Sequence, residues 1–335
     1  MEKLYDYIYY NSGFEWIVNL NILISLLFLL LILLLILFIL YLRVYKNLRN
    51  IKKAEHIEKL TDFINGYLFD TEFEEAGIEE FRVNHVRSKL QKKVTTKEIL
   101  VYSQNFKGEA NASIKKLFFR LELDNLAFKE IASRKWYLRA RGMHTISNMG
   151  IKIQESTAVR LLNDKKVEVR LQSLLYFIKL SQKYPLNFLY RLEEPLTIWQ
   201  QIHIEDALKS YKEEIPDFSK WLNHKQPTVI GFCIKQISAF NQYENVEKVV
   251  PFLEHPEEML KKEAIRCMRK MGNHESVDIV LTIFASENNT IKKEIIKLIK
   301  EVGSYNQLQA LSYELKGDNE EIKIEYLKAE EHFLK

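Results

Sequence analysis

A leucine, a short polar turn and the start of an amphipathic run follow one another in the stretch Leu162-Asn163-Asp164-Lys165-Lys166-Val167-Glu168-Val169-Arg170. The same order of an apolar residue, a polar turn and an amphipathic run returns along the rest of the chain. Its apolar starting residues are Ile131, Leu162, Leu192, Leu222, Leu253, Phe284 and Leu315. Their numbers differ by 31, 30, 30, 31, 31 and 31, which is too regular for chance. A fixed period of this length indicates a protein built from structural repeats.

The apolar residues inside each unit have the spacing of an α-helix. Positions 7, 11, 12, 15 and 18 after the starting residue lie on one helix face, because residues three or four apart share a side. Position 7 is held by Leu138, Val169, Trp199, Val229, Leu260, Ile291 and Ile322. We therefore expect each unit to open with an amphipathic helix, and Trp199 to pack in the core. Glycines at position 19, Gly150, Gly272 and Gly303, predict left-handed helix ends in three units.

A second helix is expected to complete each unit, with apolar residues such as Val277, Val280 and Phe284. Pro185 and Pro216 are suited to its first turn in the units that start at Leu162 and Leu192. A helix pair of about thirty residues cannot bury both apolar faces alone, so neighbouring units must stack on one another. The sequence therefore predicts an all-α protein whose larger part is an α-solenoid.

The repeat resembles the HEAT-repeat family over roughly residues 131–335. That family places an Asp in the turn and a Val-Arg step early in the following helix, as Asp164 and Val169-Arg170 do here. A looser match runs from Leu253 to Lys261. The resemblance implies a scaffold that binds other proteins and says little about chemistry. The unit from Leu192 departs most from the family pattern, because Trp199-Gln200 replaces the Val-Arg step.

The N-terminal part contains a candidate transmembrane helix over residues 16–43. No charged residue occurs from Trp16 to Leu42, and about 20 helical residues cross the ~30 Å hydrocarbon layer of a bilayer. A cleavable signal peptide is the alternative, but this run is too long for one and no small-residue cleavage site follows it. The residues expected at the membrane interface are Trp16, Tyr41, Arg43, Lys46 and Arg49.

Charge on the two sides of this helix predicts its orientation. Positive residues follow it from Arg43 to Lys53, whereas the tail of residues 1–15 carries three acids and Lys3 as its one cation. Because positive charge stays on the cytoplasmic side, we expect an extracytoplasmic tail and a cytoplasmic C-terminal part. The expected location is the inner membrane of a bacterium.

Residues 44–130 lack the period and are expected to form a helical juxtamembrane region that caps the array. The predicted helices are 44–68, 81–101 and 111–123, with an acidic break at 70–77. The stretches Phe106-Lys107-Gly108-Glu109, Leu117-Phe118-Phe119-Arg120-Leu121-Glu122-Leu123 and Ser133-Arg134-Lys135-Trp136 are similar to bacterial single-span HEAT-repeat proteins. Genes of those proteins often neighbour genes of membrane glycosyltransferases. This resemblance implies an integral membrane enzyme, such as a glycosyltransferase, or an envelope-biogenesis complex as the protein partner.

Position 8 of the units forms a candidate binding ladder. Its cations are Arg139, Arg170, Lys261, Lys292 and Lys323, and it is interrupted by Gln200 and Ile230. Stacked units would align these cations to hold an acidic peptide, a nucleotide or an anionic lipid. The alternative is that each cation pairs with a turn acid or carbonyl of a neighbouring unit. Trp136 and Tyr137 are further candidates for partner binding, because large aromatics dominate interface hot spots.

The sequence gives little sign of nucleic-acid binding, catalysis or metal binding. A net charge of +4 over 335 residues is low for a nucleic-acid binder, so a nucleic-acid partner is not expected. No phosphate-binding glycine loop, serine elbow or zinc-protease helix motif occurs, and we expect neither an enzyme nor a cofactor. His224 and His255 share position 2 of adjacent units, but Glu194 and Ser286 flank them, which gives at best a partial metal ligand set.

The remaining reactive side chains have structural explanations. Cys233 and Cys267 fall on the apolar helix face and are expected to be buried. The acids Glu72, Glu74, Glu75, Glu79 and Glu80 are expected to be a solvated surface. Two alternative functions stay open at this point: a HEAT-like enzyme of the lyase or glycosylase type, and an array that binds anionic lipid or nucleic acid.

Overall fold

The computed structural model describes residues 15–70, 73–180, 186–209, 214–317 and 319–335. Every regular element in these ranges is a helix, which confirms the all-α prediction. The chain divides into two units, residues 1–123 and 124–335. The predicted extracytoplasmic tail, Pro185 and Glu72 lie outside the described residues, apart from Glu15, where the first helix begins.

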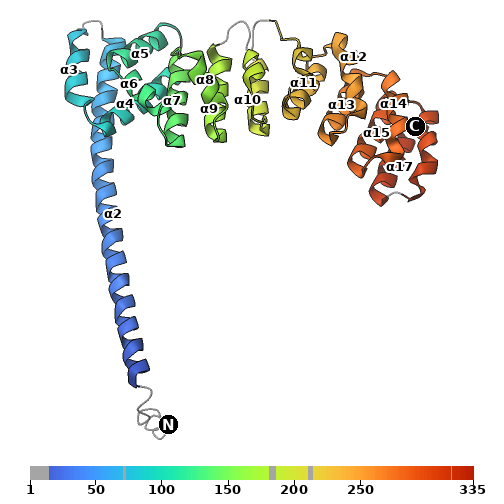
Figure 1. The fold of residues 1–335 in the computed structure, drawn as a ribbon. Coiled ribbons are helices and arrows are strands. Elements are labelled where there is room, and N and C mark those ends of the chain that lie inside the picture. The colour runs from blue at the N-terminus through green and yellow to red at the C-terminus, as the bar shows by residue number, and fades with distance from the viewer. Residues whose placement is uncertain (1–14, 71–72, 181–185, 210–213, 318) are drawn as a thin grey trace. The chain divides into compact units, whose positions relative to one another are not determined.

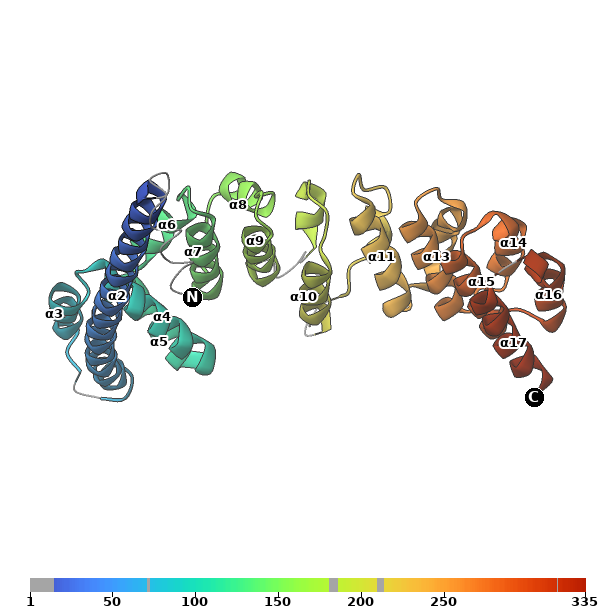
Figure 2. The ribbon, with the colours of Figure 1, turned by 90° about the horizontal axis from the view of Figure 1, so that it is seen from below.

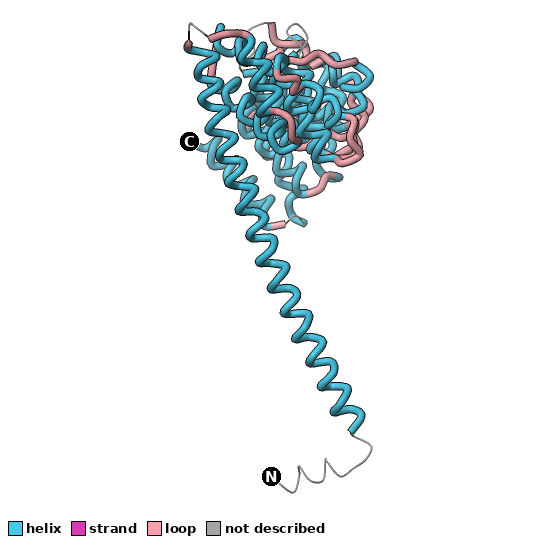
Figure 3. The backbone as a smooth tube through the Cα atoms, turned by 90° about the vertical axis from the view of Figure 1, so that its left-hand side faces the viewer, coloured by secondary structure: helices cyan, strands magenta, loops and turns pink. Residues whose placement is uncertain are grey.

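The first unit is organised by one very long helix, α2 (Glu15–Phe69), whose first half stands alone in Figure 3. Helices α3 (Ala76–His85), α4 (Lys89–Asn105) and α5 (Gly108–Arg120) gather around its second half. In this second half of α2, Leu60 and Ile64 are fully buried. The helix predicted over 44–68 is therefore confirmed as the continuation of the apolar segment.

The prediction of one helix over residues 81–101 is wrong. The chain leaves the helix after His85 and starts α4 with Ser88 as its N-cap. The Ser88 hydroxyl accepts from the Gln91 N–H and the Gln91 side chain accepts from the Ser88 N–H. Because this capping box satisfies two N–H groups that a helix start leaves open, it stabilises a new helix at this point.

The second unit is a row of long helices with shorter elements along one side (Figures 1 and 2). Its long helices are α7 (Trp136–Met149), α9 (Val167–Leu180), α10 (Ile198–Lys209), α11 (Pro227–Ala239), α13 (Glu258–Met271), α15 (Asn289–Val302) and α17 (Glu320–Leu334). Each belongs to one of the seven predicted units, which confirms the repeat. The long helix begins five residues after the starting residue, except in the unit from Leu192, where it begins six residues after.

Shorter helices pack between and beside the long ones. The α-helices among them are α6 (Asp124–Ile131), α8 (Glu155–Leu162), α12 (Val246–Val249), α14 (Glu275–Ile283) and α16 (Tyr305–Ala310). The 3₁₀ turns are η1 (Asn187–Arg191), η2 (Phe218–Trp221), η3 (Tyr243–Asn245), η4 (Val250–Glu254), η5 (Phe284–Ser286) and η6 (Leu311–Gly317). One continuous apolar core runs through this unit from Leu162 to Ala329, as stacking of incomplete units requires.

Two local predictions differ from the structure. The prediction of a second α-helix in the units from Leu162 and Leu192 is wrong. Within the described residues, these positions hold the short 3₁₀ turns η1 and η2 instead. Gly150 and Gly272 have φ of 70° and 67° and end their helices in the left-handed region, as predicted. Gly303 does not, with φ of −86° and ψ of −164°. There the chain extends so that Ser304 can cap α16.

Candidate binding surface

Position 2 of the units has a shared structural role that the sequence did not reveal. In four turns its side chain accepts a hydrogen bond from the backbone N–H two residues further on. The pairs are Ser133 with Lys135 at 3.2 Å, Asp164 with Lys166 at 3.0 Å, His224 with Gln226 at 3.0 Å and His255 with Glu257 at 3.0 Å. Such side-chain turns hold the chain in shape just before each long helix begins.

This role accounts for the two aligned histidines. Nδ1 of His224 and Nδ1 of His255 are both occupied as acceptors in their own turns. Burial lowers the pKa of His224, so it is neutral at pH 7 and suited to accept this bond. No group of three metal-binding side chains exists among the residues that the structure describes.

The cations at position 8 are largely engaged inside the chain. Nε and Nη2 of Arg139 donate to both carboxylate oxygens of Asp164 in the next unit, at 2.7 and 2.9 Å. Arg170 donates to the backbone carbonyl of Asp164 at 2.9 Å and lies 3.8 Å from Glu194. These contacts are the arrangement expected if the ladder fastens one unit to the next.

The C-terminal members of the ladder continue the pattern in part. Lys261 forms a mostly buried ion pair with Glu287 of the next unit. Nζ of Lys292 lies 5.2 Å from the centre of the Phe284 ring, and its side chain is buried. Lys323 is exposed on α17. Of the five predicted ladder cations, Lys323 is the one that is exposed.

Trp199 is not in the core, so the prediction that it packs there is wrong. Its side chain is 70% exposed, while that of its neighbour Gln200 is fully buried. The cause is the extra residue before α10, which makes Gln200 the third helical residue, the place that Val169 holds in α9. One residue turns a helix by about 100°, which moves the tryptophan out of the packed face.

This shift leaves a row of exposed apolar side chains on the first turns of three successive long helices. We call this row the aromatic edge, and it consists of Trp136, Tyr137, Val167, Ile198 and Trp199. Helices α7, α9 and α10 pack side by side in this order (Figure 2). The rings of Trp136 and Tyr137 meet edge to face with centroids 6.0 Å apart. Exposed apolar groups gathered in this way mark interaction surfaces.

The residues expected at the membrane interface all lie on α2 and point to its surroundings. Trp16, Tyr41, Arg43, Lys46 and Arg49 are exposed, and the rings of Tyr41 and Tyr45 stack with centroids 6.3 Å apart. The side chains of the most apolar 18-residue window of this helix are not covered by any other part of the structure. By length and composition α2 can cross a membrane.

The other reactive side chains are inert or solvated. Cys233 and Cys267 are buried, and burial raises the pKa of both thiols, that of Cys267 to about 12. A thiol with so high a pKa is a poor nucleophile. The described members of the acidic cluster are exposed, and Glu75 forms ion pairs with Lys116 and Arg120 at 3.1 and 3.2 Å.

Comparison with known proteins adds little to this description. No family model and no curated protein matches the chain. An engineered protein is 14% identical over 71% of this chain and 96% of its own, with a TM-score of 0.29. A designed armadillo repeat protein, YIII(Dq)4CqI, is 14% identical over 70% of this chain and 99% of its own, with a TM-score of 0.30. Kap121p is 10% identical over 82% of this chain and 33% of its own, with a TM-score of 0.30.

Such low TM-scores do not establish a common fold, so the assignment rests on the chain itself. Its evidence is the row of long helices at a nearly constant interval, their paired shorter helices and one continuous core. These features define an α-helical solenoid built from stacked repeats.

Proposed function

We propose that this protein is a membrane-anchored scaffold that binds another protein. The observation that carries the proposal is the aromatic edge, because the few residues that carry most of the binding energy at protein interfaces are enriched in tryptophan and tyrosine. These side chains stand on the first turns of packed helices, so little conformational entropy is lost when a partner covers them. Repeat solenoids offer extended surfaces of this kind.

The anchor is the apolar part of α2. Its continuation into the packed part of the first unit links the span and the globular structure by helix, without a flexible linker. Anchoring confines the protein to the membrane surface and raises its effective concentration toward partners in the same membrane. A modest interface is then sufficient for occupancy.

The finer features of the proposal follow from charge and resemblance. The cations after residue 42 favour a cytoplasmic repeat unit in a bacterial inner membrane. The resemblance to single-span HEAT-repeat proteins favours an integral membrane enzyme, such as a glycosyltransferase, as the partner. The ladder cations are proposed to hold the units together, which disfavours the alternative of a basic array for lipid or nucleic acid.

The anchor is tested by the double substitution Leu30→Arg and Leu33→Arg. Each arginine near the centre of the span should add about 2.5–3.5 kcal/mol to the cost of insertion. We expect the wild-type protein to stay in the membrane pellet after alkaline carbonate extraction and the variant to be released. Leu30→Phe with Leu33→Phe is the apolar control and should stay in the pellet. Release of the wild-type protein by the same extraction would exclude a spanning α2.

The aromatic edge is tested by affinity purification of the full chain from native membranes. The variant carries Trp136→Ala, Tyr137→Ala and Trp199→Ala, and the control carries Tyr243→Ala, another strongly exposed aromatic in the same unit. We expect one stoichiometric partner with the wild type and the control. Loss of hot-spot residues worth about 2 kcal/mol or more weakens binding at least about thirtyfold, so the triple variant should retain little of it.

Two results would contradict this function. A partner that the triple variant retains as well as the wild type would move the interface away from the aromatic edge. If no protein at all were retained by the wild type, the scaffold itself would be refuted.

A further inference from the structure

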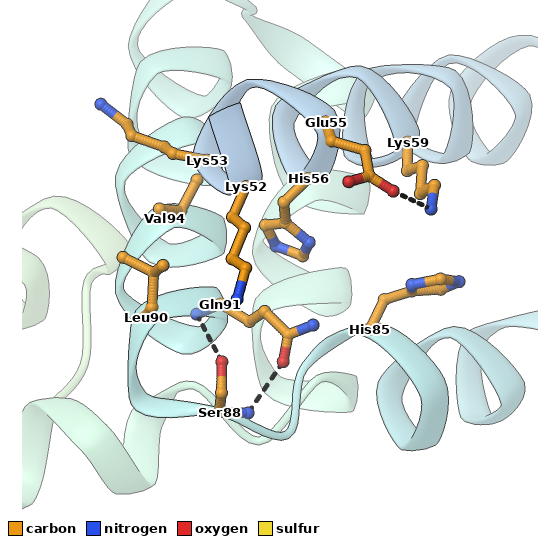
Figure 4. A pocket seen from close by; sticks show the side chains of 10 residues that line it. All are labelled: Lys52, Lys53, Glu55, His56, Lys59, His85, Ser88, Leu90, Gln91 and Val94. Carbon is orange, nitrogen blue, oxygen red and sulfur yellow. Dashed lines mark hydrogen bonds and ion pairs between the residues drawn. The ribbon is translucent and has the colours of Figure 1, made fainter. Parts of the chain in front are cut away.

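A pocket of about 190 Å³ lies in the first unit, where α2 meets the start of α4 (Figure 4). One wall is α2, and the opposite wall is the end of α3 and the first turns of α4. Its lining residues are Lys52, Lys53, Glu55, His56, Lys59, His85, Ser88, Leu90, Gln91 and Val94. The pocket is large enough for a phosphate or pyrophosphate group.

The charges around the pocket are unbalanced. Three lysines line it beside one carboxylate, that of Glu55, which already binds Lys59 at 2.8 Å. Lys52 and Lys53 have no ion-pair partner among the residues that the structure describes. This differs from Arg139 and Lys261 of the ladder, which pair with acids of the next unit. An unpaired group of cations around a cavity is a site with a positive potential.

His56 lies at the floor of the pocket, and its pKa responds to the charges nearby. It is 7% exposed and its Nε2 lies 2.9 Å from Oγ1 of Thr95. Burial is the main cause that lowers the pKa of His56, and the charges of His85 and Lys59 lower it further. A neutral imidazole held in this way can form hydrogen bonds, and it adds no charge to the pocket.

The start of α4 adds neutral donors to the same pocket. Leu90 is in the first turn of this 17-residue helix, where a backbone N–H has no acceptor within the helix. Backbone N–H groups at a helix start point out of the helix, and together with the helix dipole they favour a bound anion. The side-chain oxygen of Gln91 is used by the Ser88 N–H, which leaves its amide nitrogen as a donor. Several cations with neutral donors match a multiply charged group of several oxygens better than a single carboxylate.

We propose that this pocket binds a small soluble anion that carries a phosphate group, with Lys52 and Lys59 as its charged contacts. The alternative source of the same chemistry is a phospholipid headgroup. Lys52 follows Leu42 by ten residues, which is about 15 Å along a helix. The headgroup layer extends only ~5–7 Å beyond the hydrocarbon on each side. If α2 spans the membrane as proposed above, ordinary phospholipid phosphates end short of the pocket.

The test is a calorimetric titration of the full chain with inorganic pyrophosphate, in detergent and in phosphatidylcholine nanodiscs. Lys52→Gln removes one charged contact, and Lys97→Gln removes an exposed lysine of α4 that does not line the pocket. We expect Lys52→Gln to weaken binding about tenfold, since one charged hydrogen bond is worth at least ~1.4 kcal/mol. Lys97→Gln should leave the Kd within about twofold of wild type. Circular dichroism checks that both variants remain folded.

Nanodiscs with phosphatidylglycerol separate the two phosphate sources. At ~15 Å the membrane charge is largely screened in physiological salt, so pyrophosphate should bind equally well in these discs. Loss of binding there would show that a lipid headgroup occupies the pocket and would overturn the soluble ligand. Absence of pyrophosphate binding in detergent, or equal weakening by both substitutions, would overturn the site itself. The detergent arm does not depend on whether α2 spans a membrane.

Discussion

Replacing Asp164 by Ala should lower the free energy of unfolding of the repeat unit by about 3–5 kcal/mol. Both carboxylate oxygens of Asp164 accept from Arg139, and its carboxylate also holds the turn through the Lys166 N–H. The side chains of Asp164 and Arg139 are 9% and 15% exposed. Removal of the acid therefore leaves a mostly buried guanidinium without a countercharge, bonded only to the backbone carbonyls of Ser133 and Arg134, which is more costly than the lost contact alone.

The measurement is urea unfolding of the full chain followed by circular dichroism. Glu155→Ala is the matched control, because Glu155 also belongs to an ion pair between units, with Arg191 at 3.7 Å. Both side chains of that pair are exposed, and exposed ion pairs contribute ~0–1 kcal/mol to the free energy of unfolding. Similar losses for the two variants would mean that the Asp164 pair is no stronger than a surface contact.

Acid should remove this contribution in a defined pH range. Burial alone would raise the pKa of Asp164, but the hydrogen bonds from Arg139 and from the Lys166 N–H outweigh it, and the pKa is lowered. The stabilisation is therefore present above the unfolded value of about 3.9 and is lost as the pH falls through the lower pKa of the folded state. The stability difference between wild type and Asp164→Ala should be constant from pH 7 to pH 5 and shrink below pH ~4.

The sequence predicted the repeat well because its signal is local and recurs seven times. A helix face such as Val169 with its partners is visible in any one unit, and the constant interval removes the ambiguity. The same logic failed for Trp199, where counting from Leu192 assumed that every long helix begins at the same position. One additional residue before α10 moves every side chain of that helix by about 100°, and pattern counting cannot detect it.

The candidate binding surface was predictable only in part. Trp136 and Tyr137 were identified from residue type and are exposed, whereas Ile198 and Trp199 were missed because of the same one-residue shift. For the ladder, the alternative of pairing with a neighbouring unit describes Arg139, Arg170 and Lys261, whose acidic partners are in the next unit. Pairing of this kind depends on distances between units. The acceptor side chains at position 2 were a usable signal, since Ser, Asp and His all accept a hydrogen bond from a turn.

Gly142 carries a packing constraint that the sequence pattern does not reveal. It lies in the middle of α7, where a glycine costs about 1 kcal/mol relative to alanine. Helix propensity alone therefore predicts that Gly142→Ala stabilises the protein. However, a Cβ at this position would lie 2.9 Å from the Ala127 carbonyl oxygen and 2.9 Å from the Ile131 nitrogen, both in the backbone of α6. Backbone atoms of a packed helix cannot move aside as a flexible side chain does.

We expect Gly142→Ala to lower the free energy of unfolding by about 2–3 kcal/mol, the opposite sign to the propensity effect. To accommodate the methyl group, α6 must move away from α7. This movement also disturbs the ion pair between Arg141 of α7 and the buried Glu130 of α6. Both effects act on α6 and α7, the first helix pair of the second unit. Urea unfolding of the full chain measures the change.

Gly66→Ala provides the control, because Gly66 is also inside a helix but has room for a methyl group. Its Cβ would meet only the Phe73 ring, at 3.7 Å, which is ordinary van der Waals contact. This substitution should raise the free energy of unfolding by about 0.5–1 kcal/mol through helix propensity. If both alanine variants were stabilised alike, α6 would not be held against α7 at Gly142, and the close approach of these two helices would be refuted. Opposite signs for two identical substitutions can arise only from the neighbours of the added methyl group.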